Sequence, residues 1–182
     1  MHAGWPQIVD AVEGHGLKAI SLPEATTMEV ETIRLADPSF GASPYQGIFT
    51  VTDATVSRQI ESREIPAGSL WIPADQPDFE VAVQLFEPEA PDSLLRWGEL
   101  SSIFEMKTFI GRGRLEELAI EIIADEEIRT RWETALEDPE FAGDSRARYV
   151  WWYRQTPYWD EQVGLLPIYR VMGPPPIATP NG

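Results

Sequence analysis

Apolar and polar positions alternate in the first part of the chain, a pattern that predicts short strands. We expect strands over residues 17–22, 27–35, 48–52, 55–61 and 69–72. In residues 27–35, Met28 and Val30 fall on one face while Ile33 and Leu35 fall on the other, which predicts a bulge or a strand buried on both faces. Residues 48–52 and 55–61 are expected to form antiparallel strands joined by a turn near Asp53-Ala54. The Pro, Gly and Ser content of residues 36–47 predicts a loop.

The spacing of apolar residues changes to three and four after Pro73, as in amphipathic helices. Helices are predicted near residues 79–86, 114–124, 128–136 and 147–154, with a further helix start at Asp92 and a short N-terminal helix that begins at Pro6. Pro88 should end the first of these, because proline lacks an amide donor and disfavours helical geometry in the preceding residue. Residues 165–171 could form a closing strand, which Pro167 would confine to a sheet edge.

These elements predict the α+β class for a single domain over residues 1–172. Its β-rich part covers residues 17–72 and its helical part residues 75–156. The tail 173–182 contains four prolines and no apolar period, and we expect it to be disordered.

The formal charge of −16 narrows the class of partner. Nucleic acid and anionic membrane surfaces are attracted by clustered Lys and Arg, so neither is an expected partner. The chain has no cysteine, which excludes disulfides and thiolate chemistry. The N-terminus lacks a basic stretch followed by an apolar one, and no apolar run reaches the ~20 residues needed to span a bilayer. We therefore expect a soluble chain without a signal peptide, in a compartment that the sequence leaves open.

Catalytic and metal-binding residues are hard to find in this sequence. Glu87 and Glu89 could divide acid and base roles, but they flank Pro88 at a predicted helix end, where carboxylates are usually solvated. His2 and His15 are the two histidines, and neither belongs to a His-x-x-Glu pair. His15 lies between two glycines, which favours a role at a helix end. We expect no catalytic residue, no metal ligand and no cofactor site in this chain.

The aromatic run Tyr149-Val150-Trp151-Trp152-Tyr153 is the least ordinary feature of the sequence. Neighbouring residues on a helix point about 100° apart, so these rings must face more than one surface. One interpretation is a helix buried between other elements, which is the more common case. The other is a platform for a peptide or a sugar, or a docking surface for a partner domain. Its candidate residues are Trp151, Trp152, Tyr153, Tyr158 and Trp159.

The block PAGSLWIPADQPDFEVAVQLFEPEAPDSLLRWG (residues 66–98) resembles the C-terminal region of large bacterial M14-type zinc carboxypeptidase-like proteins. The resemblance continues through IFEMKTFIG, DPEFAGDSRARYVWWYRQTPYWD and LLPIYRV, and covers residues 8–171. The zinc ligands of that family, a His-x-x-Glu pair and a later His, and its general-base Glu have no matching positions here.

The resemblance therefore implies a noncatalytic accessory domain. Its partner would be an M14-type catalytic domain, in cis or in trans, which would hold the zinc. The resemblance is also compatible with a periplasmic or secreted parent protein, and it leaves the compartment open. The alternative is an independent acidic binding protein or enzyme that uses its acidic and aromatic surface.

Overall fold

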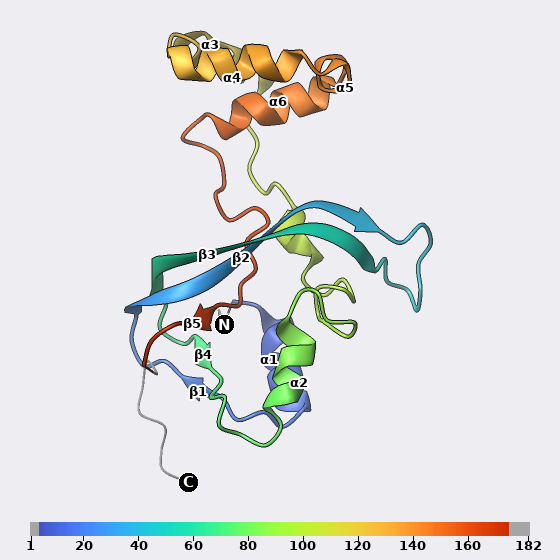
Figure 1. Cartoon of the computed structure of the whole chain (residues 1–182), viewed down its shortest axis with the longest axis vertical. Coiled ribbons are helices and arrows are strands. Elements are labelled where there is room, and N and C mark those ends of the chain that lie inside the picture. Colours follow the sequence, from blue (N-terminus) through green and yellow to red (C-terminus); the bar gives the residue numbers. More distant parts are fainter. Residues whose placement is uncertain (1–3, 175–182) are drawn as a thin grey trace. The chain divides into compact units, whose positions relative to one another are not determined.

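The computed structural model describes residues 4–174, and their contacts divide them into two units (Figure 1). Unit 1 comprises residues 4–105 and 162–174, and unit 2 comprises residues 106–161. Antiparallel strands in the N-terminal half and helices in the C-terminal half confirm the α+β class. The single domain over 1–172 stays a prediction, since two units can still fold as one domain. The tail predicted to be disordered lies almost wholly outside the described residues.

A long antiparallel hairpin forms the main sheet of unit 1. Strand β2 (Thr26–Phe40) pairs with β3 (Val51–Ile65) from Thr26↔Ile65 to Phe40↔Val51, and β5 (Arg170–Val171) lies on the other edge of β2. The predicted loop 36–47 begins later than expected, because the ladder continues past Ala36 through register shifts. Residues 51–52 and 55–61 of the two predicted strands belong to the single strand β3, which has no turn at Asp53, whereas residues 48–50 lie before it.

Two short strands and two helices complete unit 1. Strand β1 (Ile20–Ser21) pairs with β4 (Leu70–Trp71). Helices α1 (Pro6–Gly14) and α2 (Phe79–Phe86) lie side by side below the hairpin in Figure 1. Both belong to one apolar cluster with the sheet, whose buried members include Ile8, Val12, Ile33, Leu35, Ala82, Phe86, Leu100 and Leu166. A separate, smaller cluster contains Leu22, Val30 and Ile65.

The helix predicted to start at Asp92 does not form, and residues 91–100 adopt consecutive turns instead. The Ser93 hydroxyl is buried there; it donates to the Pro88 carbonyl (3.3 Å) and accepts from the Arg96 amide (3.1 Å). A side chain that bonds the nearby backbone in this way stabilises turns at the expense of a helix. A 3-10 turn, η1 (Ser101–Phe104), follows.

Glu87 and Glu89 lie just after α2 and make ion pairs with arginines of the sheet. Glu87 binds Arg170 of β5 at 2.6 Å, and Glu89 binds Arg58 of β3 at 2.6 Å. Arg170 also contacts Glu31 of β2 at 2.5 Å. These ion pairs connect the end of α2 to three strands.

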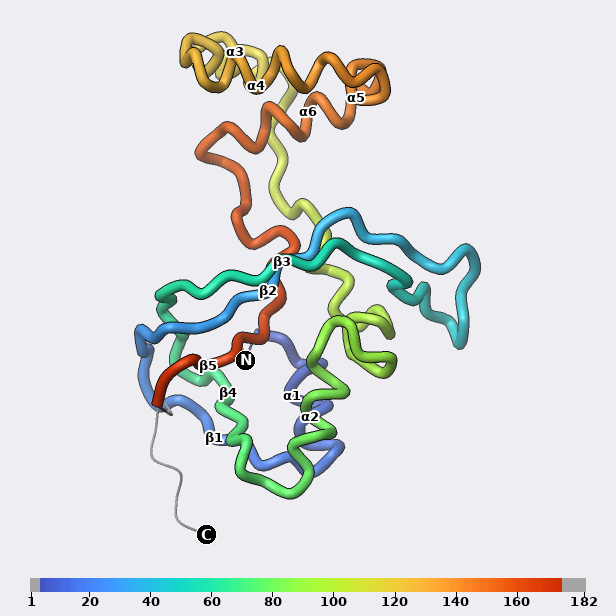
Figure 2. Tube along the Cα trace, in the orientation of Figure 1, coloured from blue at the N-terminus to red at the C-terminus, as the bar shows by residue number. Residues whose placement is uncertain are grey.

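Residues 163–171 return to β2 after unit 2 and complete the main sheet (Figure 2). The Leu35 amide donates to the Gly164 carbonyl (2.8 Å), and the Leu166 amide donates to the Ile33 carbonyl (2.9 Å). Gly164 has φ +75°, and a Cβ placed on it would lie 2.2 Å from the Leu35 carbonyl oxygen. Only glycine fits this approach of two backbones.

We expect Gly164→Ala to destabilise unit 1. The left-handed conformation alone costs about 1–2 kcal/mol for a residue with a Cβ, and the backbone overlap adds to it. Gly113→Ala is the matched control: Gly113 lies in the first turn of a helix with nothing within 4 Å of the added carbon. Alanine there should not destabilise the helix, because alanine has the higher helix propensity. Urea unfolding of both variants measures the difference, and equal midpoints would contradict the role of Gly164.

Candidate functional site

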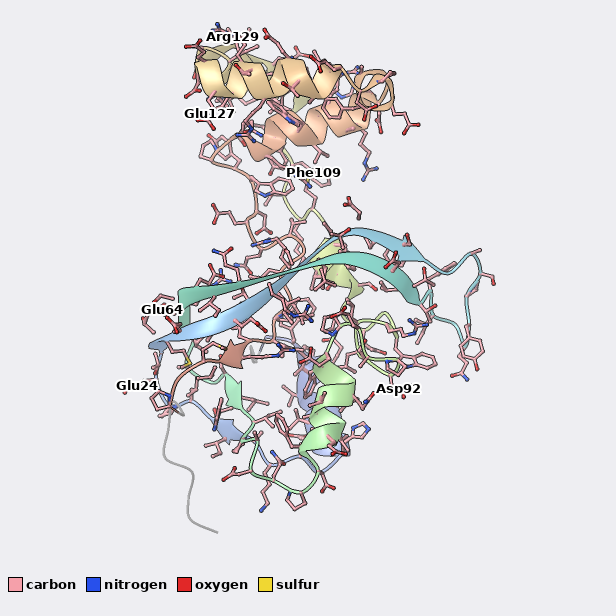
Figure 3. All side chains as sticks on the ribbon, viewed as in Figure 1. Glu24, Glu64, Asp92, Phe109, Glu127 and Arg129 are labelled. Carbon is pink, nitrogen blue, oxygen red and sulfur yellow. The ribbon has the colours of Figure 1, made fainter. Side chains whose placement is uncertain are left out.

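Four helices form unit 2, and aspartates begin three of them. They are α3 (Arg112–Ile122), α4 (Glu126–Leu136), α5 (Pro139–Gly143) and α6 (Ser145–Arg154). Asp125, Asp138 and Asp144 are the N-caps of α4, α5 and α6, and each carboxylate accepts hydrogen bonds from amides of the first turn. Such caps satisfy amides that have no partner within the helix. Arg129, labelled in Figure 3, donates to the Ile123 carbonyl at the end of α3.

Aromatic rings provide much of the packing between α4, α5 and α6. The Trp132 ring of α4 lies 4.9 Å from those of Trp151 and Trp152 and 5.8 Å from that of Phe141, measured between centroids. The rings meet at tilted or edge-on angles, the favourable geometry for aromatic pairs. No residue of α4 is fully buried, so these rings replace an aliphatic core along that helix.

Two tyrosines of α6 fix the segments that flank the helices. The Tyr149 hydroxyl donates to the Ile110 carbonyl at 2.6 Å. Tyr153 is fully buried; its hydroxyl lies 2.6 Å from the Thr108 hydroxyl and donates to the Tyr158 carbonyl at 2.9 Å. Residues before α3 and after α6 are therefore held to the same helix.

A groove of about 600 Å³ lies over α3, α4 and α6. Its walls combine aliphatic side chains of α3, among them Leu115, Ala119 and Ile120, with the rings of Trp132 and Trp152. Ile120 is 74% exposed, and Phe109, labelled in Figure 3, is 82% exposed in the segment before α3. Phe109 does not line the groove, whose walls also include the charged side chains of Arg112, Glu116 and Arg148. The apolar part of the groove, with Ile120 and Trp152, is typical of interaction sites.

The five residues predicted to form a docking surface occupy different environments. Tyr153 belongs to the interior of unit 2, and Trp159 packs against it at 5.5 Å. Trp152 is half-buried and lines the groove, whereas Trp151 packs on Trp132 and Trp152. Tyr158 is 53% exposed. The docking role stays a prediction; within it, Trp152 is the residue that borders a recessed apolar surface.

Sequence reasoning missed the contribution of α3 and α4 to this groove. Ala119 and Trp132 belong to apolar stripes that predict helices, but nothing in the sequence joins those stripes to the aromatic run. Ile120 lies outside the stripe formed by Leu115, Leu118, Ala119, Ile122 and Ile123, so the apolar spacing did not mark it as part of a surface.

Several polar groups of unit 2 form hydrogen bonds with the backbone at helix ends. The pKa of Asp144 is lowered by the hydrogen bonds that its carboxylate accepts from the amides of Ala147 and Arg146. Within residues 4–174, no group of three or more His, Cys, Asp or Glu side chains is arranged to hold a metal ion. No helix of this part of the chain is long and apolar enough to cross a bilayer.

The chain is similar to fungal carboxypeptidases over half of its length. It is 34% identical over 96 residues to carboxypeptidase 2 of Trichophyton tonsurans and of Trichophyton equinum, and 33% identical to that of Trichophyton rubrum. Each match covers 52% of this chain and only 17% of the relative. No protein-family profile and no solved structure matches the chain. This similarity indicates a carboxypeptidase-associated region. These relatives are fungal, whereas the resemblance noted in the sequence pointed to bacterial proteins.

Tyr153→Phe should destabilise unit 2 by about 1–2 kcal/mol, because it removes the hydroxyl that bonds the Tyr158 carbonyl and the Thr108 hydroxyl at partly buried positions. Tyr158→Phe is the control, since an exposed tyrosine should change stability by less than about 0.5 kcal/mol. Denaturant unfolding followed by tryptophan fluorescence compares them. Equal effects of the two changes would place Tyr153 outside the core.

Asp144 should make the stability of α6 depend on pH. Its folded pKa is below the unfolded value of about 3.9, so its contribution is complete above that value and is lost as pH falls through the folded pKa. Asp144→Asn keeps a capping side chain but cannot titrate. The wild type should melt above this variant at neutral pH, and the gap should close in acid. A gap that stays constant down to pH 2 would contradict the assignment.

Proposed function

We propose that this chain is a noncatalytic accessory region of an M14-type zinc carboxypeptidase and that it packs against the peptidase domain. The observation that carries the proposal is the extent of the similarity: 96 residues of this chain match 17% of fungal carboxypeptidase 2. The remainder of such a relative has ample length for a separate peptidase domain. With two histidines and no cysteine, this chain is poor in the usual zinc ligands.

The groove of unit 2 is the proposed contact with the peptidase domain. It offers an exposed aliphatic side chain, Ile120, beside the half-buried ring of Trp152. Buried aromatic and aliphatic anchors commonly dominate the affinity of such interfaces, whereas surrounding polar contacts contribute little. The alternative, an independent acidic binding protein or enzyme, does not require a carboxypeptidase partner.

The test uses carboxypeptidase 2 of Trichophyton tonsurans from which the matching region has been deleted. We expect the full chain described here to bind this truncated enzyme in trans and to raise its thermal stability. Ile120→Ser should leave the chain folded and weaken binding at least tenfold, as expected for loss of an interface anchor worth about 1.4 kcal/mol or more.

Ile60→Ser is the matched control, because Ile60 is a similarly exposed isoleucine (54%) in β3 of unit 1. It should not change the affinity. Absence of binding by the wild type would contradict the accessory role, and equal losses in both variants would remove the groove as its site. Hydrolysis of a carboxypeptidase substrate by this chain alone would contradict the noncatalytic assignment.

A further inference from the structure

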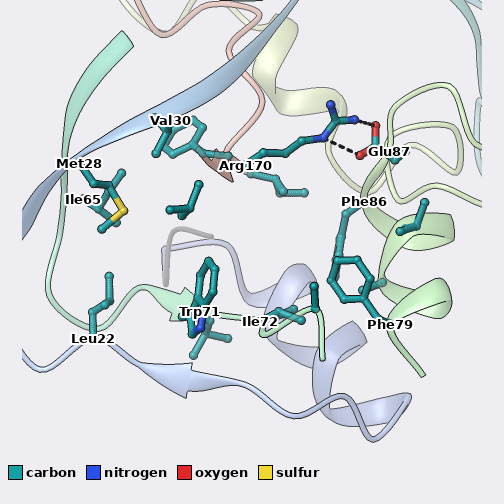
Figure 4. A pocket seen from close by; sticks show the side chains of 17 residues that line it. Leu22, Met28, Val30, Ile65, Trp71, Ile72, Phe79, Phe86, Glu87 and Arg170 are labelled. Carbon is teal, nitrogen blue, oxygen red and sulfur yellow. Dashed lines mark hydrogen bonds and ion pairs between the residues drawn. The ribbon is translucent and has the colours of Figure 1, made fainter. Parts of the chain in front are cut away.

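Unit 1 contains a cavity of about 660 Å³ that is separate from the groove of unit 2 (Figure 4). Its walls come from β2, β3, β5, α2 and residues 70–74. Figure 4 shows Trp71 at one side, Phe79 and Phe86 at the second, and Met28, Val30 and Ile65 at the third. A volume of this size lies within the 300–1,000 Å³ range of sites that bind small molecules.

The cavity separates the two apolar clusters of unit 1. Phe86 and Ala82 on one wall belong to the larger cluster, whereas Val30 and Ile65 on the opposite wall belong to the smaller one. Protein interiors normally pack without voids larger than a few atoms, because side chains that face empty space lose their contacts. An apolar occupant would join the two clusters into one continuous core.

The charged groups at the cavity are matched within the protein. The guanidinium of Arg170 donates to Glu87 (3.1 Å) and to Glu31 (2.5 Å), and the dashed lines in Figure 4 mark its contacts with Glu87. Burial raises the pKa of Tyr169, so its hydroxyl is neutral at physiological pH. The net charge of −16 further disfavours an anion. The walls thus offer apolar surface and no unmatched charge.

Apolar walls also distinguish a small molecule from a peptide. A peptide would bring backbone N–H and C=O groups against these apolar side chains, and each group left without a partner would lose its hydration at a cost. The edges of β2 cannot supply partners there, since β3 occupies one edge and β5 pairs on the other at Val30 and Glu31. We propose that the cavity of unit 1 binds a small, uncharged, apolar molecule.

Titration with N-phenyl-1-naphthylamine, an uncharged apolar dye whose fluorescence rises in apolar surroundings, tests this inference on the full chain. We expect saturable binding of one dye per chain. Ala82→Trp should weaken it at least tenfold, because Ala82 lines the cavity and is 4% exposed. Ala119→Trp, which fills the groove of unit 2, should leave the affinity unchanged.

Val83→Trp provides a second variant should Ala82→Trp fail to fold. Val83 also lines the cavity but is 39% exposed, so a larger side chain there can narrow the opening without entering the core. Melting curves identify which variants are folded. No saturable binding to the wild type, or an equal loss in Ala119→Trp, would overturn the inference.

Charge selectivity provides an independent readout. The anionic analogue 8-anilinonaphthalene-1-sulfonate should bind at least tenfold more weakly than the neutral dye. Glu87→Gln removes one of the carboxylates that neutralise Arg170, so it should strengthen binding of the anion severalfold relative to that of the neutral dye. Equal binding of both dyes to the wild type would contradict an uncharged ligand. If neither dye binds but Ala82→Trp weakens association with the truncated carboxypeptidase, the cavity holds a protein segment and the inference is wrong.

Discussion

The pairing of residues 163–171 with β2 is the constraint on which unit 1 depends. Strand β2 receives β3 along one edge, from the adjacent part of the sequence, and residues 163–171 along the other, from beyond unit 2. The returning segment also carries Leu165 and Leu166 into the interior. Because this contact joins residues more than 100 positions apart, it must overcome the entropy of closing a long loop. Unit 1 is therefore incomplete without the last part of the described chain.

Local patterns predicted the helices better than the strands. The stripes near residues 79–86, 114–124, 128–136 and 147–154 correspond to α2, α3, α4 and α6, since three-and-four spacing is a property of the helix alone. The length of β3 could not be read in the same way. Asp53 resembles a turn residue, but its carboxylate accepts from the Ala54 amide within a continuous strand. Pairing with β2 decided this conformation, and single-sequence propensity does not contain that information.

The aromatic run illustrates how far helical geometry alone can locate a site. Adjacent rings had to face different surfaces, and they do: Tyr153 faces the interior, whereas Trp152 borders the groove. Which ring takes which role depends on α3 and α4, and the sequence held no signal that Trp132 would lie against Trp151 and Trp152. The ion pairs of Glu87 and Glu89 were equally hidden, because Arg58 and Arg170 are distant in sequence.

The groove of unit 2 and the cavity of unit 1 differ in whether the residues that line them also hold their unit together. Residues 106–161 are few for an independent core, because chains of this size bury a smaller fraction of their surface on folding, about 60%, than larger domains do. Unit 2 consequently uses Trp132 and Trp152 both to hold its helices together and to form the groove, so a partner there would bind rings that are already fixed in place. In unit 1 the large cluster packs without the cavity, which lies between it and the smaller cluster. An occupant of that cavity would therefore add contacts to a sheet already completed by β5, whereas an occupant of the groove would cover surface that the helices leave exposed.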